Sequence, residues 1–178
     1  ASRGEYLNAL LMAEYLGFRF VDATEWMTFK YDGSVDFART EEKLRDIVGI
    51  YGHIVTPGFY GSLPSGEVKV FSRGGSDITG AIAAASIDAE MYENWTDVSG
   101  ILMTDPRIVD KPHSIPRVTY AELREMSYMG ASVLHEDTVF PVRNKDIPVN
   151  IRNTNDPDAP GTIIREKFDE DTEIENER

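Results

Sequence analysis

Apolar positions along the chain alternate between helical and extended spacing. Residues 6–16 are almost continuously apolar and are followed by Gly17, so we predict a buried helix that ends at a left-handed glycine. The aromatic and β-branched residues within 18–23 then predict a strand. A second helix is predicted over residues 40–50, with the threonine that opens it as its cap, and a second strand over residues 53–59.

The middle of the chain continues this alternation. The glycine- and proline-containing residues 60–66, followed by the β-rich residues 67–71, predict a β-hairpin. An alanine-rich helix over residues 78–87 and a strand over residues 89–95 come next. Because a strand, a glycine turn, a helix and a strand succeed one another, we predict a right-handed crossover unit.

The last third of the chain adds one helix and two strands. Thr119 and Glu122 have the spacing of a capping box, which predicts a helix that ends near Gly130. Residues 147–151 and 162–164 predict two closing strands. Helices and strands therefore alternate along the chain, which predicts an α/β protein built in layers.

Composition narrows the function classes. With 178 residues and 41% hydrophobic residues, the chain has the size of one main domain. Its net charge of -13 opposes binding to nucleic acid or to an anionic membrane, since both need a basic face. The absence of cysteine excludes disulfides and cysteine nucleophiles, and no apolar run reaches the ~20 residues of a membrane span. We expect a soluble, cytoplasmic protein.

Both ends predict continuation into other parts of a longer protein. The chain opens at Ala1 and enters an apolar helix almost at once, which we interpret as a start within a domain. From residue 166 onward the composition turns strongly acidic, as in linkers. We therefore expect a domain over residues 1–165 and an acidic linker over residues 166–178 that leads to an absent domain.

A pair of glycines before the predicted alanine-rich helix is the first candidate for chemistry. Gly74 and Gly75 leave room for a ligand to approach the backbone N–H groups at the start of a helix, where an anion is favoured. Arg73 adds a planar fork suited to a carboxylate, and Ser76 or Asp77 can cap the helix. Without a longer match, these residues favour an ordinary helix start beside a surface arginine.

The longer segment around this turn, Ser72 to Ala81, resembles the hallmark segment of aspartate kinases within the amino-acid kinase fold. The resemblance implies that the substrate aspartate is contacted by Arg73, Gly74, Gly75 and Ser76. It also implies that Arg73 and Asp77 take part in catalysis, with Asp77 ordering the turn close to the transferring phosphate. The segment from Ser2 to Ala9 resembles the family segment whose glutamate receives the substrate's ammonium group, here Glu5.

Two further segments resemble the family's ATP-binding stretches. Residues 95–107 should form a loop at the carboxyl edge of the sheet, and the resemblance implies ATP contacts from Thr96, Asp97, Leu102 and Arg107. By themselves, these residues favour a plain Asp-Pro turn with Arg107 on the surface. Residues 126–136 resemble a segment in which many members carry a lysine where this chain has Ser132, so the ATP roles of Ser132 and Val133 lack the expected charge. We interpret His135 as a packed structural residue.

The resemblance extends over residues 147–154 and 160–164, and so over the chain up to Arg165. It implies a three-layer α/β/α sandwich with a mainly parallel sheet, which this chain forms only in part. It further implies transfer of the γ-phosphoryl group of ATP, with Mg2+, to L-aspartate at the start of lysine, threonine and methionine synthesis. We assign no metal ligand within the chain.

The family's N-terminal Lys-Phe-Gly-Gly loop and its C-terminal effector-sensing domains have no counterpart in the sequence. We therefore predict a fragment that is inactive alone, from an enzyme that is a homo-oligomer at full length. Two alternatives stay open. One is another amino-acid kinase, acting on glutamate, a nucleoside monophosphate or carbamate, and the other is a ligand-binding remnant that kept the fold without the chemistry.

Overall fold

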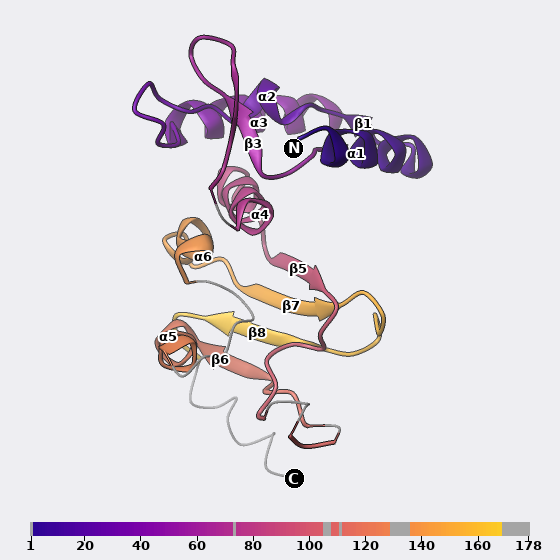
Figure 1. The fold of residues 1–178 in the computed structure, drawn as a ribbon, viewed down its shortest axis with the longest axis vertical. Coiled ribbons are helices and arrows are strands. Elements are labelled where there is room, and N and C mark those ends of the chain that lie inside the picture. The colour runs from indigo at the N-terminus through magenta and orange to yellow at the C-terminus, as the bar shows by residue number, and fades with distance from the viewer. Residues whose placement is uncertain (1, 73, 105–107, 111, 129–135, 169–178) are drawn as a thin grey trace. The chain divides into compact units, whose positions relative to one another are not determined.

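The computed structural model describes residues 2–72, 74–104, 108–110, 112–128 and 136–168. The chain divides into two compact units, residues 1–89 and 90–178. The first unit contains α1 (Arg3–Leu16), β1 (Arg19–Phe20), α2 (Ala23–Trp26), α3 (Phe37–Tyr51), β2 (Ile54–Val55), β3 (Tyr60–Ser62), β4 (Val68–Val70) and α4 (Gly75–Ser86) (Figure 1). The second contains β5 (Tyr92–Thr96), β6 (Arg117–Thr119), α5 (Tyr120–Tyr128), α6 (Glu136–Arg143), β7 (Val149–Asn153) and β8 (Thr162–Arg165).

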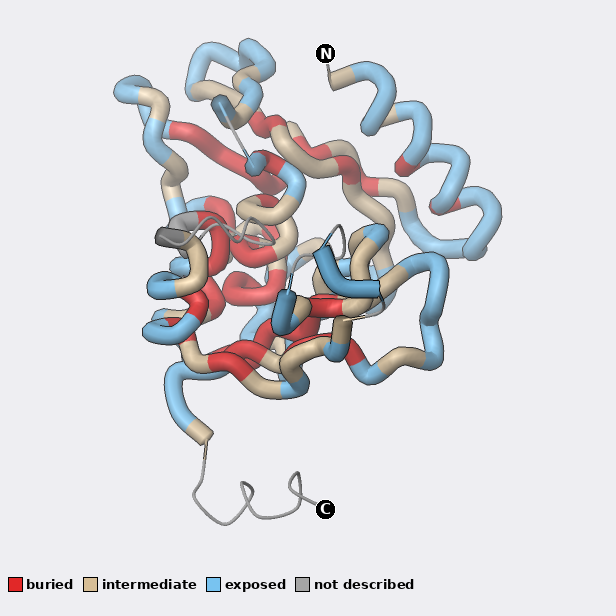
Figure 2. Tube along the Cα trace, turned by 60° about the horizontal axis from the view of Figure 1, so that its bottom comes forward, coloured by how far each residue is buried: buried red, intermediate tan, exposed pale blue. Residues whose placement is uncertain are grey.

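In the first unit, β1 and β2 pair in parallel and α1 packs beside them. The helix buries Ala9 and Ala13, and the ring of Tyr6 meets that of Phe20 edge-on at 5.2 Å between centroids. Gly17 ends the helix with a φ of 70°, as predicted. Figure 2 shows only short buried stretches on this otherwise exposed helix, so the prediction that it is buried is wrong; Leu7, Leu11 and Tyr15 are exposed.

The core of this unit is an apolar cluster to which β2, the loops and three helices contribute. Its fully buried members are Val21, Trp26, Met27, Phe29, Leu44 and Ile82. The predicted hairpin is confirmed, because β3 and β4 pair antiparallel with Tyr60 opposite Val70. The hairpin connects the end of β2 to the start of α4 and so brings the glycine turn back to the carboxyl edge of the strands.

Two predicted boundaries in this unit are wrong. The strand over residues 18–23 ends at Phe20, because Asp22 caps α2 and accepts a bond of 2.8 Å from the N–H of Thr24. The helix expected to start at Thr40 starts at Phe37 instead, with Asp36 as its cap. Thr40 is buried, and its hydroxyl accepts a bond of 3.1 Å from the N–H of Thr28, so a tertiary contact rather than a helix end explains this threonine.

The second unit is a four-stranded mixed sheet in the order β5-β7-β8-β6. β5 pairs in parallel with β7, β6 pairs in parallel with β8, and β7 and β8 pair antiparallel. The predicted capping box is confirmed. The Thr119 N–H donates to a Glu122 carboxylate oxygen at 2.7 Å, and the Glu122 N–H donates to the Thr119 hydroxyl at 3.2 Å. The predicted helix end near Gly130 lies outside the described residues.

The pairings confirm the α/β class and the mostly parallel sheet. Among the described strands, three of the five pairs are parallel. Helix α6 is an addition that the sequence did not predict, since Pro141 lies inside it. The predicted crossover unit stays a prediction, because β2 and β5 belong to different sheets of different units. In the described part of the chain, no helix is long and apolar enough to cross a bilayer.

Candidate functional site

The predicted glycine turn lies directly at the N-terminus of α4. Gly74 is the N-cap and adopts the left-handed conformation with a φ of 59°. Gly74 has no side chain that could cap this end, and Ser76 and Asp77 lie beyond the N-cap position, so our expectation that one of them is the N-cap residue is wrong. Both residues lie inside the first turn because the helix starts earlier than predicted. A helix of 12 residues thus begins at two glycines, and its N-terminal N–H groups favour an anionic ligand.

Close packing explains the second glycine of the turn. A Cβ atom on Gly75 would lie 2.6 Å from the Cβ and 2.9 Å from the Cα of Phe59, well inside ordinary contact distance. A Cβ on Gly58 would similarly lie 3.3 Å from the Cα of Ser76. The loop after β2 and the start of α4 therefore touch backbone to backbone, and glycine is required where they meet. Arg73 lies outside the described residues.

Phe59 is a functional candidate that the sequence reasoning missed. Its φ of 62° lies in the left-handed region, which is unusual for a bulky residue and often marks a site under functional constraint. Its carbonyl accepts a bond of 2.9 Å from the N–H of Phe71, and its own N–H donates to the Thr79 hydroxyl at 3.0 Å. No sequence pattern marks this conformation, because it depends on contacts with two distant segments.

The carboxyl ends of β1 and β2 gather further polar groups at one edge. Asp22 follows β1, and Thr56 follows β2 and accepts a bond of 2.9 Å from the indole N–H of Trp26. Tyr60 is buried, and burial together with the charge of Asp22 and a hydrogen bond to that carboxylate raises the pKa of its hydroxyl far above the ordinary value. Asp22 and Tyr60 were not predicted as site residues.

The start of α1 lies at this same edge. Tyr6 and Arg3 are close enough to the Tyr60 hydroxyl to influence its pKa, Tyr6 raising it and Arg3 lowering it. Glu5 lies between them in the first turn of α1 and is exposed. The structure thus places the predicted ammonium ligand and the glycine turn in one compact unit, on elements that meet at the carboxyl edge of β1 and β2.

The predicted nucleotide residues lie in the second unit. Thr96 ends β5 and Asp97 follows it, exposed, with the Thr96 hydroxyl 3.3 Å from a carboxylate oxygen of Asp97. The N–H and the hydroxyl of Thr154 both donate to the Thr96 carbonyl, at 2.8 and 2.9 Å. Because Thr154 directly follows β7, the ends of the two parallel strands are fixed to each other at the edge where the predicted loop begins.

This loop runs from the strand end to Leu102, as expected. Leu102 forms an isolated antiparallel bridge with Ser114 and is partly buried. Its neighbour Ile101 is buried and donates its N–H to the Thr162 hydroxyl at 2.8 Å, which fixes the loop to β8. The remaining predicted ATP residues, Arg107, Ser132 and Val133, lie outside the described residues, as does His135.

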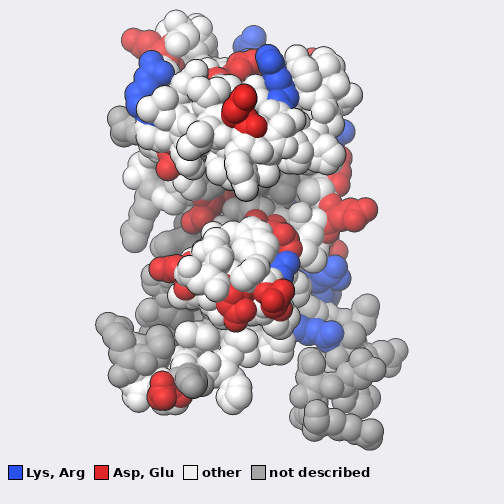
Figure 3. Space-filling model, turned by 90° about the vertical axis from the view of Figure 1, so that its right-hand side faces the viewer, with Lys and Arg blue, Asp and Glu red and all other residues white. Residues whose placement is uncertain are grey.

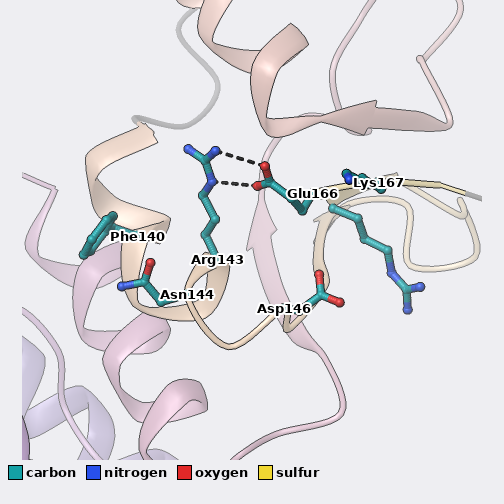
Figure 4. Close-up of a pocket in the computed structure, with 7 residues that line it drawn as sticks. Phe140, Arg143, Asn144, Asp146, Glu166 and Lys167 are labelled. Atoms are coloured by element: carbon teal, nitrogen blue, oxygen red, sulfur yellow. Dashed lines mark hydrogen bonds and ion pairs between the residues drawn. The ribbon is translucent and has the colours of Figure 1, made fainter.

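A separate polar cavity of about 620 Å³ lies in the second unit between α6 and the end of β8 (Figure 4). Arg143 crosses it to form two bonds with Glu166, at 2.8 and 3.2 Å, and this pairing lowers the pKa of the Glu166 carboxyl. None of the predicted site residues that the structure describes lines the cavity, whose described lining consists of Phe140, Arg143, Asn144, Asp146, Arg165, Glu166 and Lys167. The first residue of the expected linker thus contacts α6.

Charge over the molecule follows its composition. On the face in Figure 3, acidic side chains are spread widely, and Lys and Arg occur singly or in small groups. This face matches the net charge of -13. The anion preference inferred for the turn rests on the helix N-terminus.

Comparison with known proteins identifies the family. The family model described as "Amino acid kinase family" matches residues 1–153. The chain belongs to the amino acid kinase family. Within this family, the chain is 38% identical over 174 residues to aspartokinase 3 of Bacillus subtilis, covering 93% of this chain and 38% of that protein.

Two solved aspartate kinase structures are also similar. The chain shares 52% identity with the Clostridium acetobutylicum aspartate kinase, with a TM-score of 0.84 over 92% of this chain and 37% of that one. It shares 34% identity with E. coli aspartokinase III in complex with aspartate and ADP, with a TM-score of 0.83 over 95% of this chain and 40% of that one. The fold predicted from the resemblance is therefore confirmed, and the chain spans about two fifths of the length of these relatives.

Proposed function

We propose that this chain is part of an aspartate kinase, which transfers the γ-phosphoryl group of ATP to the side-chain carboxylate of L-aspartate. The observation that carries the proposal is the glycine turn at the start of α4, found in a chain that matches aspartokinases over nearly its whole length. Because the chain spans about two fifths of those relatives, the activity is proposed for the complete enzyme.

Aspartate is a zwitterion and needs an anionic and a cationic anchor. The N-terminal N–H groups of α4, at Gly75 and Ser76, would hold a substrate carboxylate, and Arg73 would add a guanidinium fork. Glu5, in the first turn of α1, would receive the ammonium group. Tyr60 interacts with Asp22 and lies near Tyr6 and Arg3 at the start of α1, which supports a binding surface at this edge.

The chemistry requires positioning more than proton transfer. The side-chain carboxylate of aspartate is ionised at neutral pH, so it can attack the γ-phosphorus without a general base. A carboxylate oxygen forms a bond to phosphorus as the bond to the bridging oxygen breaks, giving ADP and 4-phospho-L-aspartate. Asp77, in the first turn of α4, would order the turn near the transferring group, and Arg73 would neutralise charge that develops there.

The second unit would hold the nucleotide. Thr96 and Asp97 lie at the end of β5 and Leu102 in the loop that follows, a position where open α/β sheets bind ligands. We assign Arg107, Ser132 and Val133 to the same ATP site on the basis of the resemblance. Mg2+ commonly binds through one or two carboxylates and the substrate phosphates. We propose that Mg2+ accompanies the nucleotide in this way.

We further propose that residues 1–165 belong to the catalytic domain and that residues 166–178 form an acidic linker. The family match over residues 1–153 and the pairing of β8 with both its neighbours support the first part. The acidic composition supports the second. The complete enzyme would be a cytoplasmic homo-oligomer, with the longer length of its relatives reflecting further domains.

A panel of phosphoryl acceptors tests the proposed function. The complete enzyme containing this chain is assayed with MgATP and L-aspartate, L-glutamate, UMP or carbamate, and ADP release is followed. We expect turnover with aspartate, together with an acyl phosphate that hydroxylamine traps. Turnover with any other acceptor in preference to aspartate refutes the proposal, as does the lack of turnover with aspartate in a folded enzyme.

A further inference from the structure

Thr79, one turn into α4, connects three parts of the candidate aspartate site. It is 4% exposed, and its hydroxyl takes part in two hydrogen bonds. The oxygen accepts from the N–H of Phe59 at 3.0 Å, and the hydroxyl proton is donated to the carbonyl of Gly75 at 2.6 Å. A single buried hydroxyl therefore joins the left-handed loop residue to the glycine that begins the helix.

The bond to Gly75 is ordinary, whereas the bond to Phe59 is not. Threonine and serine inside helices commonly donate to the carbonyl four residues earlier, as Ser86 of the same helix does to Ile82 at 2.7 Å. Thr79 in addition satisfies the N–H of Phe59, which has a φ of 62°. A bulky residue keeps that conformation only when its surroundings fix it.

Phe59 also holds the N-terminal side of the glycine turn. Its carbonyl accepts from the N–H of Phe71 at 2.9 Å, directly before the segment that contains Ser72 and Gly74. The backbone of Phe59 is thus bonded on its N–H side to α4 and on its carbonyl side to the end of the hairpin. Both ends of the glycine turn are fixed to one residue, and the Thr79 hydroxyl closes this connection.

We propose that Thr79 is a positioning residue that holds the glycine turn in the geometry that binds aspartate. This inference rests on the proposed function for its kinetic consequence. The positioning role requires the hydroxyl and not the methyl group of Thr79. Serine retains the hydroxyl and both bonds, whereas valine has the shape of threonine but can neither accept from Phe59 nor donate to Gly75.

The test compares Thr79→Val and Thr79→Ser in the complete enzyme. Because a misplacement of about 1 Å can cost on the order of a hundredfold in rate, we expect Thr79→Val to raise the KM for aspartate about tenfold. The KM for ATP should change by less than about twofold, and Thr79→Ser should restore the KM for aspartate to within about twofold of wild type. Ser86→Ala is the matched control, since it removes a buried hydroxyl bond from the same helix away from the turn.

Amide hydrogen exchange over residues 71–78, without ligand, tests the connection independently of activity. Faster exchange in Thr79→Val, with wild-type exchange in Thr79→Ser and Ser86→Ala, is expected. The positioning role is refuted by unchanged exchange and unchanged KM in Thr79→Val, or by an equal rise of KM in Ser86→Ala. If the wild-type enzyme does not phosphorylate aspartate, the proposed function fails, and the exchange measurement still decides whether Thr79 holds the turn.

Discussion

Adding one methyl group at Gly75 perturbs the candidate aspartate site at its tightest point. In Gly75→Ala, the new Cβ would lie 2.6 Å from the Cβ of Phe59 and 3.0 Å from the Cβ of Phe71. Ordinary contact begins at 3.4 Å, so the first distance must grow by 3.4 − 2.6 = 0.8 Å. The atoms that oppose the new methyl group lie on or next to the backbone, and rotation of a flexible side chain cannot relieve the overlap.

The expected magnitudes follow from this displacement. Overpacking of a well-packed site costs about 1–3 kcal/mol, and replacing a helical glycine with alanine returns about 0.5–1 kcal/mol. We expect a net loss of roughly 1–2 kcal/mol in the free energy of unfolding. A displacement near 1 Å in the turn that binds the substrate should raise the KM for aspartate or lower kcat by about 10- to 100-fold.

Steady-state kinetics of the complete enzyme, with thermal unfolding alongside, measures both effects. Gly49→Ala is the control, since nothing lies within 4 Å of a Cβ at this position in α3 and the substitution should be neutral or slightly stabilising. A Gly75→Ala enzyme with wild-type Tm and wild-type KM for aspartate would show that the loop after β2 does not constrain the turn, and the reasoning would fail.

Two further substitutions test other parts of the structure. Thr119→Ala removes the hydroxyl from the capping box and should lower the free energy of unfolding by about 1 kcal/mol at pH 7, measured by urea unfolding. The bonds from Thr119 lower the pKa of Glu122, so part of this stability is lost as the pH falls through that pKa. The difference in unfolding free energy between wild type and Thr119→Ala should therefore be smaller at pH 3 than at pH 7. An equal difference at both pH values contradicts this. For Tyr60, the raised pKa favours the neutral hydroxyl in the folded state, so its contribution is present below the ordinary pKa of about 10 and lost as the pH rises above it. Tyr60→Phe should therefore lose less unfolding free energy than wild type between pH 9 and 11. Tyr31→Phe, at an 86% exposed residue, is the control and should match wild type. If unfolding free energy falls equally with pH in all three proteins, the role given to Tyr60 is refuted.

Features determined by nearby residues could be predicted from the sequence. The helix that ends at Gly17, the hairpin over residues 60–71 and the capping box of Thr119 and Glu122 each depend on the conformational preferences of a few consecutive residues. The alternation of helices and strands predicted the α/β class, whereas the mainly parallel pairing was implied by the family resemblance. The glycine turn was located correctly, although its helix starts before the residues expected to cap it.

Features that depend on distant contacts could not be predicted. Thr40 has the sequence context of a helix cap, yet a buried bond to Thr28 explains it. Phe59 has no local reason for a positive φ, because its conformation is fixed by Phe71 and by Thr79, residues that lie 12 and 20 positions further along the chain. Such residues surround the predicted turn and hold it, and they were found only once the folded chain brought them together.

Binding of L-aspartate at the α4 N-terminus is the central claim, and amide hydrogen exchange with and without the ligand tests it most directly. In the complete enzyme with MgADP present, saturating L-aspartate should slow exchange of the backbone amides from Gly74 to Asp77, since those N–H groups would bond to a substrate carboxylate. Residues 117–122, around the capping box in the other unit, serve as an internal reference and should not change. Protection of the turn by aspartate, and not by glutamate at the same concentration, is the predicted result. Unchanged exchange at the turn in an enzyme that turns over aspartate would contradict the account.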